Sequence, residues 1–416
     1  MKIIISNGHS KFILGPAATE AEKRGCLTRY ITGGYPTQNI KKIIYHLGLG
    51  RFKSLQRLLF RQEEIRDCVI SPIWLSEFLF QAGVWISHFN FLKDISYKFN
   101  IFSMQIYGFF AKNILKDCAH GNIYHFRSGY GHSSIAKAKI LGMVAICDHS
   151  IAHPEILEYL VDNSGVYPEK NLSLKPSEFW QKVLSDLRQS DFIIANSDFV
   201  KETCIYQGCS AERIYVAYTG VDNEFMNTIP TRQRNLSAEK KLKLCFAGDF
   251  GRRKGAAFLI EALMSIGDMH WEIEIIGDVD KTIKYEYPQF FNDARVTFFD
   301  FMPRHNLAKH FTNADIFIFP SLAEGSARVI FMAMACGCYV ITTKNSGSIV
   351  EDGVHGSIVS PGDARQLENT IRSVLATRRE EIYSIGEMNA ALIEEKYRQK
   401  NYGDQLFSIY EEILSK

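Results

Sequence analysis

The sequence predicts an α/β protein made of two Rossmann-like, doubly wound domains. Three observations carry this prediction. The 416 residues suffice for two domains of about 200 residues each. Short apolar segments alternate with expected helices along most of the chain, which is typical of parallel strands joined by helices. Two of the apolar segments lead through a glycine-containing turn into a helix, as strands of a doubly wound sheet do.

Twelve strands are expected, in two sets. The first set comprises residues 2–6, 27–32, 122–126, 143–148, 191–196 and 213–218. The second set comprises residues 242–247, 271–276, 295–299, 316–319, 339–342 and 356–359. The polar residues 223–241 lie between the sets. They are predicted to link an N-terminal domain, residues 1–222, to a C-terminal domain, residues 242–400.

The loop that carries Glu324 is the first candidate site. It follows the strand 316–319 and leads into a helix expected to begin near Ser326. The first N–H groups of a helix lack partners and carry partial positive charge, which suits a phosphate or diphosphate. The Glu324 carboxylate can accept hydrogen bonds from neutral hydroxyls. A diphosphate beside a polyol describes a nucleotide sugar, although an ordinary strand, loop and helix with an acid near the helix start stays an alternative.

A second strand, glycine turn and helix follow residue 242. Gly248 and Gly251 permit a tight turn, and Arg253 and Lys254 stand near the start of the next helix. Arginine and lysine both bind phosphate oxygens. Basic residues before a helix are usually solvated when they occur alone. Together with the Glu324 loop, they indicate a site for a negatively charged ligand.

These motifs resemble those of the retaining glycosyltransferases of family 4, the group 1 glycosyl transferases, which have the GT-B fold. GDFGRRKG resembles the basic phosphate loop of that family, and PSLAEGSARVIFMAMACG resembles its donor-sugar loop and helix. VEDGVHGSIVSPGD resembles the segment that closes the site, and DFIIANSDFVKET with RIYVAYTGVD resembles the interdomain link. The resemblance implies two domains that face each other across a cleft, with a last helix, residues 401–416, returning to the N-terminal domain.

The resemblance also implies roles for particular residues. It places the donor diphosphate on Gly248, Arg253 and Lys254, and the donor sugar beside Glu324. The loop and helix start after Glu324 complete the donor site: Gly325, Ser326, Ala327 and Arg328. His149, at the end of the fourth strand, matches a family histidine near the donor sugar, so the catalytic candidates are Glu324, His149 and Lys254.

The N-terminal domain is expected to bind the acceptor, because ligands of open parallel sheets lie beyond the carboxyl ends of the strands. Gly15 follows the first strand, and Arg127 and His132 follow the third. These three residues are the acceptor candidates. A histidine at such a position more often has a structural role, and the resemblance does not change this for His132.

The chain departs from the family pattern at three positions. Met332 stands where the family has a second Glu that holds the ribose. Ser348 replaces another Glu, and Asp249 replaces an Arg of the basic loop. The departures put ribose recognition in doubt and leave Arg253 and Lys254 as the cations of the site.

The expected activity is transfer of a hexose from a nucleoside diphosphate sugar to an acceptor hydroxyl with retention. The acceptor would be a glycan or a lipid-linked molecule, in glycan, lipopolysaccharide or glycolipid assembly. No metal and no cofactor are expected, because cations of the chain would neutralise the leaving diphosphate. Two alternatives stay open: a catalytically silent GT-B subunit that binds a partner, and a sugar-nucleotide epimerase.

Composition indicates a cytoplasmic protein with no nucleic-acid partner. The net charge is only +2, so no overall field favours nucleic acid. The nine cysteines form no CxxC motif, which favours a reducing compartment. The first residues read as a strand rather than a signal peptide, and no apolar run approaches about 18 residues, so no spanning helix is expected.

A basic segment between Lys41 and Arg66 is a candidate for contact with an anionic membrane surface. Its basic residues recur at near-helical spacing among apolar ones, and residues 71–115 after it are rich in Trp and Phe. A basic amphipathic helix beside aromatic residues can lie in a membrane interface. The alternative is that the aromatic residues form core and the basic ones are a solvated face.

Overall fold

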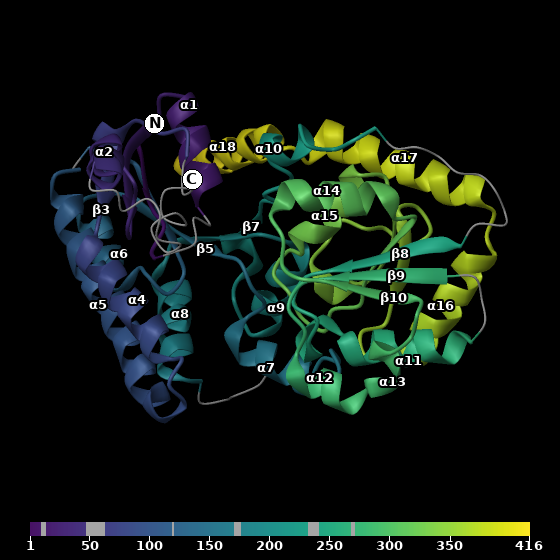
Figure 1. The fold of residues 1–416 in the computed structure, drawn as a ribbon. Coiled ribbons are helices and arrows are strands. Elements are labelled where there is room, and N and C mark those ends of the chain that lie inside the picture. The colour runs from purple at the N-terminus through teal and green to yellow at the C-terminus, as the bar shows by residue number, and fades with distance from the viewer. Residues whose placement is uncertain (10–13, 47–62, 119, 170–175, 232–240, 268–270) are drawn as a thin grey trace.

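The computed structural model describes residues 1–9, 14–46, 63–118, 120–169, 176–231, 241–267 and 271–416. Figure 1 shows two sheets, one in each half of the chain, with helices around both. In the described residues the sheets are a seven-stranded one and a six-stranded one, and every strand pair in them is parallel. The α/β prediction is therefore confirmed.

The sheet of the N-terminal half has the strand order β3-β2-β1-β4-β5-β6-β7. Its strands are β1 (Ile3–Ser6), β2 (Leu27–Thr32), β3 (Ile70–Pro72), β4 (Ile123–Arg127), β5 (Val144–His149), β6 (Phe192–Ala195) and β7 (Ile214–Val216). All six strands expected in this half are present, with ends shifted by at most two residues. The edge strand β3 was not predicted.

Two helical layers cover this sheet. One face packs against α5 (Lys93–Lys116), α6 (His132–Ile140), α8 (Glu178–Gln189) and α9 (Asp198–Tyr206). The other face packs against α1 (Gly15–Lys23) and the last helix, α18 (Gln399–Ser415). Side chains of β1 alternate between the two layers, with Ile4 on the first face and Ile3 and Ile5 on the second. The other α-helices that the structure describes before Asp191 are α2 (Gln38–His46), α4 (Trp74–Ile86) and α7 (Pro154–Asp162).

The segment expected to contact a membrane is described only in part. Most of the segment between Lys41 and Arg66 lies outside the described residues. The aromatic residues that follow it lie on α4 and α5, and Phe78, Trp85 and Phe109 among them are exposed. Core packing therefore does not account for these three side chains.

The helix α18 joins the C-terminal end of the chain to the N-terminal sheet. Tyr410 hydrogen-bonds to Nδ1 of the buried His125 on β4 at 2.6 Å. Arg24 at the end of α1 pairs with Asp404 at 2.5 Å. The end of the chain thus completes one face of the first sheet.

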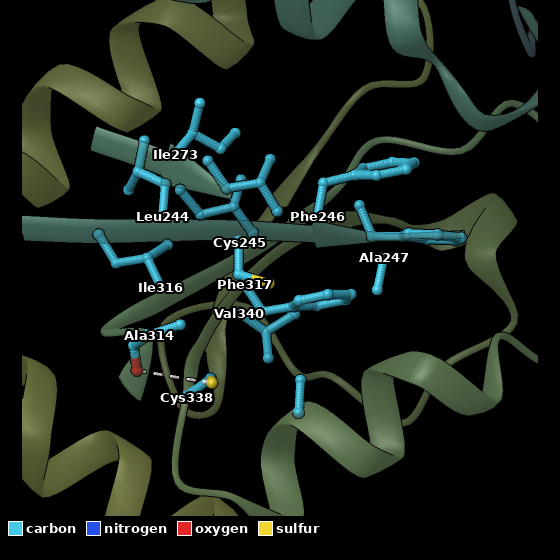
Figure 2. Packing of buried hydrophobic residues seen from close by; sticks show 14 of the residues in the cluster. Leu244, Cys245, Phe246, Ala247, Ile273, Ala314, Ile316, Phe317, Cys338 and Val340 are labelled. Carbon is cyan, nitrogen blue, oxygen red and sulfur yellow. Dashed lines mark hydrogen bonds between the residues drawn. The ribbon is translucent and has the colours of Figure 1, made fainter. Parts of the chain in front are cut away.

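The sheet of the C-terminal half has the order β10-β9-β8-β11-β12-β13. Its strands are β8 (Leu242–Ala247), β9 (Trp271–Ile276), β10 (Val296–Phe299), β11 (Ile316–Phe319), β12 (Tyr339–Thr343) and β13 (Gly356–Val359). Figure 2 shows the tight packing around β8, where Leu244, Cys245 and Phe246 are all almost completely buried. Successive buried residues mean that helices cover both faces, as in other parallel sheets.

The helices of this half are α11 (Ala256–Ile266), α12 (Lys281–Glu286), α13 (Pro288–Phe291), α14 (Arg304–Asn313), α15 (Arg328–Ala335), α16 (Ala364–Ala376) and α17 (Arg379–Lys396). Among the described helices, none combines the length and the apolar character needed to cross a bilayer.

The chain crosses between the two halves twice, near Val221 and near Gln399, and the two crossings lie side by side. Val221 donates its N–H to Tyr397 O at 2.8 Å and accepts from the N–H of Gln399 at 3.0 Å. The stretch predicted as a polar linker begins with a short helix, α10 (Asn223–Met226). Asp222 caps this helix, and Phe225 is buried in the core of the C-terminal half. Residues 232–240 of the expected linker lie outside the described residues.

Candidate active site

The loop after β8 carries two cations at the carboxyl end of the C-terminal sheet. It passes Gly248 and a short 3-10 helix (Arg252–Lys254), and reaches Gly255 at the start of α11. Gly255 has a φ of 75°, and a Cβ atom there would lie 2.1 Å from the carbonyl oxygen of Pro320. Only glycine fits this position, because both the φ angle and the close approach exclude a side chain. The approach brings the basic loop beside the loop that follows β11.

Arg253, Lys254 and Glu324 meet in one cluster between these two loops. Oε1 of Glu324 lies 2.5 Å from Arg253 Nη1 and 2.6 Å from Lys254 Nζ. Ser321 Oγ donates to the same oxygen at 3.1 Å. Burial lowers the pKa of Lys254, and the Glu324 carboxylate partly opposes that effect. Two cations around one carboxylate leave an excess of positive charge, which suits a phosphate ligand.

The Glu324 loop also contacts the N-terminal half. Ala152 N–H donates to Glu324 O at 3.2 Å, and Ser197 Oγ donates to Gly325 O at 2.5 Å. A Cβ atom at Gly325 would lie 2.0 Å from Ser150 O. The loop therefore lies against the carboxyl ends of β5 and β6, at the interface of the two halves.

His149 is the last residue of β5 and immediately precedes Ser150, so it lies on the N-terminal side of this interface. It is completely buried, and its Nδ1 lies 3.1 Å from Ser128 Oγ. Its Nε2 has no hydrogen-bond partner among the described residues. Burial, helped by His153, lowers the pKa of His149 to about 3, so the imidazole is neutral at physiological pH. A buried nitrogen without a partner is costly unless a ligand satisfies it.

The start of α15 differs from the expected phosphate cradle. The helix begins at Arg328 rather than near Ser326, and Ser326 and Ala327 lie in the preceding loop. The Ala327 N–H donates to Ser346 O at 3.0 Å, so it is not available to a ligand. The Arg328 side chain points to Asp222, at 3.3 Å, rather than to Glu324.

A cavity of 330 Å³ surrounds Arg328 between the two halves. Asp222 also pairs with Arg304, at the start of α14. The distance from Arg304 Nη1 to Asp222 Oδ2 is 2.6 Å. Glu63 also lines this cavity, and burial is the main cause that raises its pKa to about 7. The cavity thus combines two guanidinium groups with carboxylates from the N-terminal half and the interdomain crossing.

A second cavity, of 610 Å³, lies between α9 and the loop after β12. Its wall carries four carboxylates, Asp198, Glu202, Glu351 and Asp352, against one lysine, Lys344. Such a wall repels a diphosphate. The cavity is larger than the first but less suited to the expected donor.

The three acceptor candidates do not form one cluster. Gly15 begins α1 and packs so closely on Glu63 that a Cβ atom would lie 2.2 Å from Glu63 Oε1. Arg127, at the end of β4, donates to His9 O at 3.4 Å and lies over the ring of Tyr130. The His132 Cβ faces Gly108 of α5. His132 itself is exposed to solvent, although its Cβ lies beside α5.

Two residues of this region were not predicted from the sequence. Asp186 of α8 holds the turn after β4, because its carboxylate accepts the N–H groups of Gly129 and Gly131 at 2.8 Å and of His132 at 3.0 Å. Burial raises the pKa of Asp186 to about 6. No local pattern marks this acid, since its partners lie more than fifty residues earlier.

His9, in the loop after β1, is the other unpredicted residue. Its Nε2 hydrogen-bonds to Ser76 Oγ, and its ring stacks on Phe80 at 4.9 Å. Its Nδ1 has no partner among the described residues. Burial lowers the pKa of His9 to about 4. The polar NGHS sequence directly after the first strand was the available signal.

No group of three or more His, Cys, Asp or Glu side chains within the described ranges is arranged to hold a metal ion. The cysteines of those ranges are all free. Met332, at the position of the family's second Glu, is buried in the core of the C-terminal half.

Comparisons with known proteins found similarity to glycosyltransferases. Residues 228–399 match the family model described as glycosyl transferases group 1. The chain is 26% identical over 191 residues to the amylovoran biosynthesis glycosyltransferase AmsK of Erwinia amylovora, covering 43% of this chain and 46% of that protein. It is 23% identical over 238 residues to the putative colanic acid biosynthesis glycosyltransferase WcaL of Escherichia coli strain K12, covering 54% and 58%. The chain thus spans about half the length of these curated relatives.

The structure is similar to that of HepE from Anabaena in complex with UDP and glucose. The TM-score is 0.62 at 15% identity, and the match covers 99% of both chains. The similarity extends over both sheets and the last helix. The fold is GT-B, as the sequence predicted.

Proposed function

We propose that this chain is a glycosyltransferase that moves a sugar from a nucleoside diphosphate sugar to an acceptor hydroxyl. The observation that carries the proposal is the cluster of Arg253, Lys254 and Glu324, which lies against the strand end that bears His149. The match of residues 228–399 to the group 1 model, and the named activities of the relatives, support it.

The cations would stabilise the leaving diphosphate. Charge develops on the phosphate oxygens as the bond to the sugar breaks, and preorganised cations in a partly buried site stabilise that charge. Arg253 and Lys254 already lie side by side on Oε1 of Glu324. We assign Glu324 Oε2 to a hydroxyl of the donor sugar, so that one carboxylate positions both the cations and the sugar.

We assign His149 to hydrogen bonding rather than to proton abstraction. Its neutral ring and unpartnered Nε2 suit a donor-sugar hydroxyl or the developing charge. For retention, the acceptor oxygen forms its bond to the anomeric carbon on the face from which the diphosphate leaves. The leaving phosphate oxygen then takes the acceptor proton.

We further propose that the sugar is a hexose and that no metal takes part. The acceptor would be a glycan or a lipid-linked molecule of polysaccharide, lipopolysaccharide or glycolipid assembly. Activity should persist in EDTA, because Arg253 and Lys254 supply the positive charge at the diphosphate. An absolute requirement for added Mg²⁺ or Mn²⁺ would contradict this account.

One assay tests the proposal against its two alternatives. The purified protein is incubated with UDP-, GDP- and ADP-sugars while nucleotide release and sugar identity are followed. Nucleotide release that depends on Glu324 supports transfer or its hydrolytic side reaction. A changed sugar without release would identify an epimerase. Neither product with any donor would favour a silent subunit, which the loss of the ribose-binding Glu at Met332 would explain.

A further inference from the structure

Two cysteines lie at the C-terminal end of α9, in a turn that brings them together. The helix ends at Tyr206, and Gly208 after it has a φ of 91°. The N–H of Gly208 donates to Ile205 O at 2.9 Å, and the N–H of Cys209 donates to Cys204 O at 3.0 Å. These two bonds and the left-handed glycine define a Schellman motif, in which side chains at the positions of Cys204 and Cys209 commonly contact each other.

The same geometry permits a disulfide between these two residues. The hydrogen bond between the Cys209 amide and the Cys204 carbonyl keeps the two Cα atoms within about 7 Å, which is the limit for a disulfide without backbone movement. The two thiols also hydrogen-bond to each other, so their side chains point together. The bridge can therefore close in the folded protein.

Cys209 carries the reactive thiol of the pair. It is half-buried, whereas Cys204 is completely buried. The hydrogen bond from Cys204 and the neighbouring His153 hold the pKa of the Cys209 thiol below its ordinary value. The same hydrogen bond and burial raise the pKa of Cys204, which therefore keeps its proton. Since the thiolate is the nucleophilic form, the pair combines an accessible nucleophile with a second thiol in contact.

His153 reaches this turn from the loop after β5. Its N–H donates to Thr203 Oγ1 of α9 at 3.0 Å, which fixes the loop beside the end of the helix. Metal binding does not compete with thiol chemistry here. In the described ranges, no group of three or more His, Cys, Asp or Glu side chains is placed to hold a metal ion.

Another pair of cysteines in the chain shows the contrast. Cys336 and Cys338 are separated by one residue, and both are buried. Their thiols donate to the backbone carbonyls of Ala308 and Phe311. Buried thiols in such surroundings stay protonated and inert. The arrangement at the end of α9, and not closeness in the sequence, is therefore what makes a reactive pair.

We propose that Cys204 and Cys209 are a redox-active pair that a peroxide converts reversibly to a disulfide. The Cys209 thiolate attacks one oxygen of the peroxide, the O–O bond breaks, and a sulfenic acid forms while hydroxide leaves. The Cys204 thiol then attacks the Cys209 sulfur, its proton joins the departing hydroxide, and water leaves as the S–S bond forms. The two sulfur atoms lose two electrons, which reduce the peroxide. An added dithiol reverses the reaction and becomes a disulfide itself.

The pair lies at the opposite end of α9 from the candidate active site. The helix begins after Ser197, which contacts the loop of Glu324 through Gly325. Thiol oxidation requires no nucleotide sugar. The experiments below therefore test the pair independently of the proposed transferase activity.

Peroxide treatment of the folded full chain tests the proposal. After a small excess of hydrogen peroxide, the remaining thiols are blocked with N-ethylmaleimide and the protein is digested for mass spectrometry. The peptide that holds Cys204 and Cys209 should be lighter by two hydrogen atoms, and dithiothreitol should restore both thiols. Cys26 is the matched control, because it is half-buried like Cys209 but donates its thiol proton to Arg24 O at 3.5 Å. It should take up maleimide as in untreated protein.

Alkylation rates test the nucleophile. An ordinary exposed thiol is about 1% thiolate at pH 6.5, so iodoacetamide should label Cys209 at least about tenfold faster than the exposed Cys68. Cys204→Ala should move the pH midpoint of Cys209 labelling upwards, because the thiolate loses its hydrogen-bond donor. The same variant should stop the oxidation at the sulfenic acid, which dimedone traps. Cys209→Ser, a change at the half-buried position, should leave Cys204 unoxidised.

The thermal midpoint shows whether the bridge belongs to the folded state. The oxidised protein should unfold at or above the midpoint of the reduced protein, because the folded backbone already holds the two residues together. This measurement and the peptide analysis use the wild type, so they do not depend on the folding of any variant.

Three results would overturn the proposal. Both thiols could take up maleimide after peroxide treatment. Cys26 or Cys68 could react as fast as Cys209, which would mean that the thiols react without selectivity. The oxidised protein could unfold below the midpoint of the reduced protein, which would mean that the bridge forms only in unfolded chains.

Discussion

At the scale of single residues, Glu324 acts as the centre of the candidate site. The sequence indicated an acid beside a helix start and two cations on another loop, but not that all three would meet on one oxygen. This arrangement depends on the approach of two loops about seventy residues apart, which Gly255 permits. The sequence predicted Glu324 as a ligand of the donor sugar and did not indicate its contact with both cations.

Removing either side of this cluster should abolish or weaken transfer. Lys254→Ala should lower the rate over affinity for the donor by roughly ten- to hundredfold, the effect of losing one charge-assisted phosphate contact worth about 1.5–3 kcal/mol. Glu324→Ala should lower it at least as much, because the cations lose their common partner. Steady-state nucleotide release measures both. Arg252→Ala is the control, since Arg252 lies in the same loop but is 65% exposed and faces Asp162 at 3.6 Å.

Burial of His149 should make the fold sensitive to acid. The pKa of His149 is about 3 in the folded protein, against about 6.5 in an unfolded chain, so the unfolded state binds the proton first. Stability is then lost as pH falls from about 7 towards 3. His149→Gln should remove about 1 kcal/mol of the stability difference between pH 7.5 and 5.5, as measured by urea unfolding. His120→Gln, an exposed change, should leave that difference as it is in the wild type.

At the scale of elements, the sequence predicts the longer strands correctly, but it does not predict contacts between residues that are far apart in the chain. All twelve expected strands are present, because parallel strands covered on both faces are marked by continuous apolar runs. The strand β3 was missed since it has only three residues and ends in Pro72, which an edge strand tolerates. The α4–α5 aromatic residues have the same composition whether they form core or surface, so only the fold distinguishes the two.

The turn after β4 is an example of what local patterns leave out. Three N–H groups of this turn converge on Asp186, which comes from a helix more than fifty residues later. An acid in an amphipathic helix gives no sign of such partners. In the same way, Ala327 belongs to the donor loop that the sequence indicates, but no local pattern shows that its N–H donates to the distant Ser346 carbonyl.

Asp186→Asn should therefore destabilise the N-terminal half. An amide has one acceptor oxygen and directs N–H donors at a neighbouring N–H, so buried donors of the turn lose their partner. The expected loss is about 1–3 kcal/mol in the free energy of unfolding, followed by chemical denaturation at pH 7.5. Asp162→Asn, at a side chain that is 66% exposed, should change stability by less than about 0.5 kcal/mol. Equal effects of the two variants would mean that the turn finds other partners.

At the scale of the whole molecule, the two halves are joined at one end and in contact at the other. The crossings at Val221 and Gln399 form a hydrogen-bonded pair, which fixes one side of the interface. The contact of Gly325 with Ser150 and Ser197 closes another part of it. Glu324 and His149 lie next to this contact on opposite halves, so their separation depends on how closely the halves approach.

Gly325→Ala should open this contact. The new Cβ would lie 2.0 Å from Ser150 O, and backbone on both sides leaves no flexible side chain to yield. The halves must therefore separate, which should enlarge the radius of gyration in small-angle X-ray scattering. Nucleotide release should fall by about a hundredfold, since a displacement of about 1 Å between reacting groups has an effect of that order.

The control for Gly325→Ala is a substitution that creates a similarly close contact inside one half. A Cβ atom at Gly386 would lie 2.1 Å from Gly337 O, within the C-terminal half. Gly386→Ala should lower the thermal midpoint while the radius of gyration stays as in the wild type. Gly325→Ala should show the reverse pattern, because it strains the interface rather than a core. If Gly325→Ala kept full activity and the original dimensions, the interface would not determine the geometry of the site, and Glu324 and His149 would not act together.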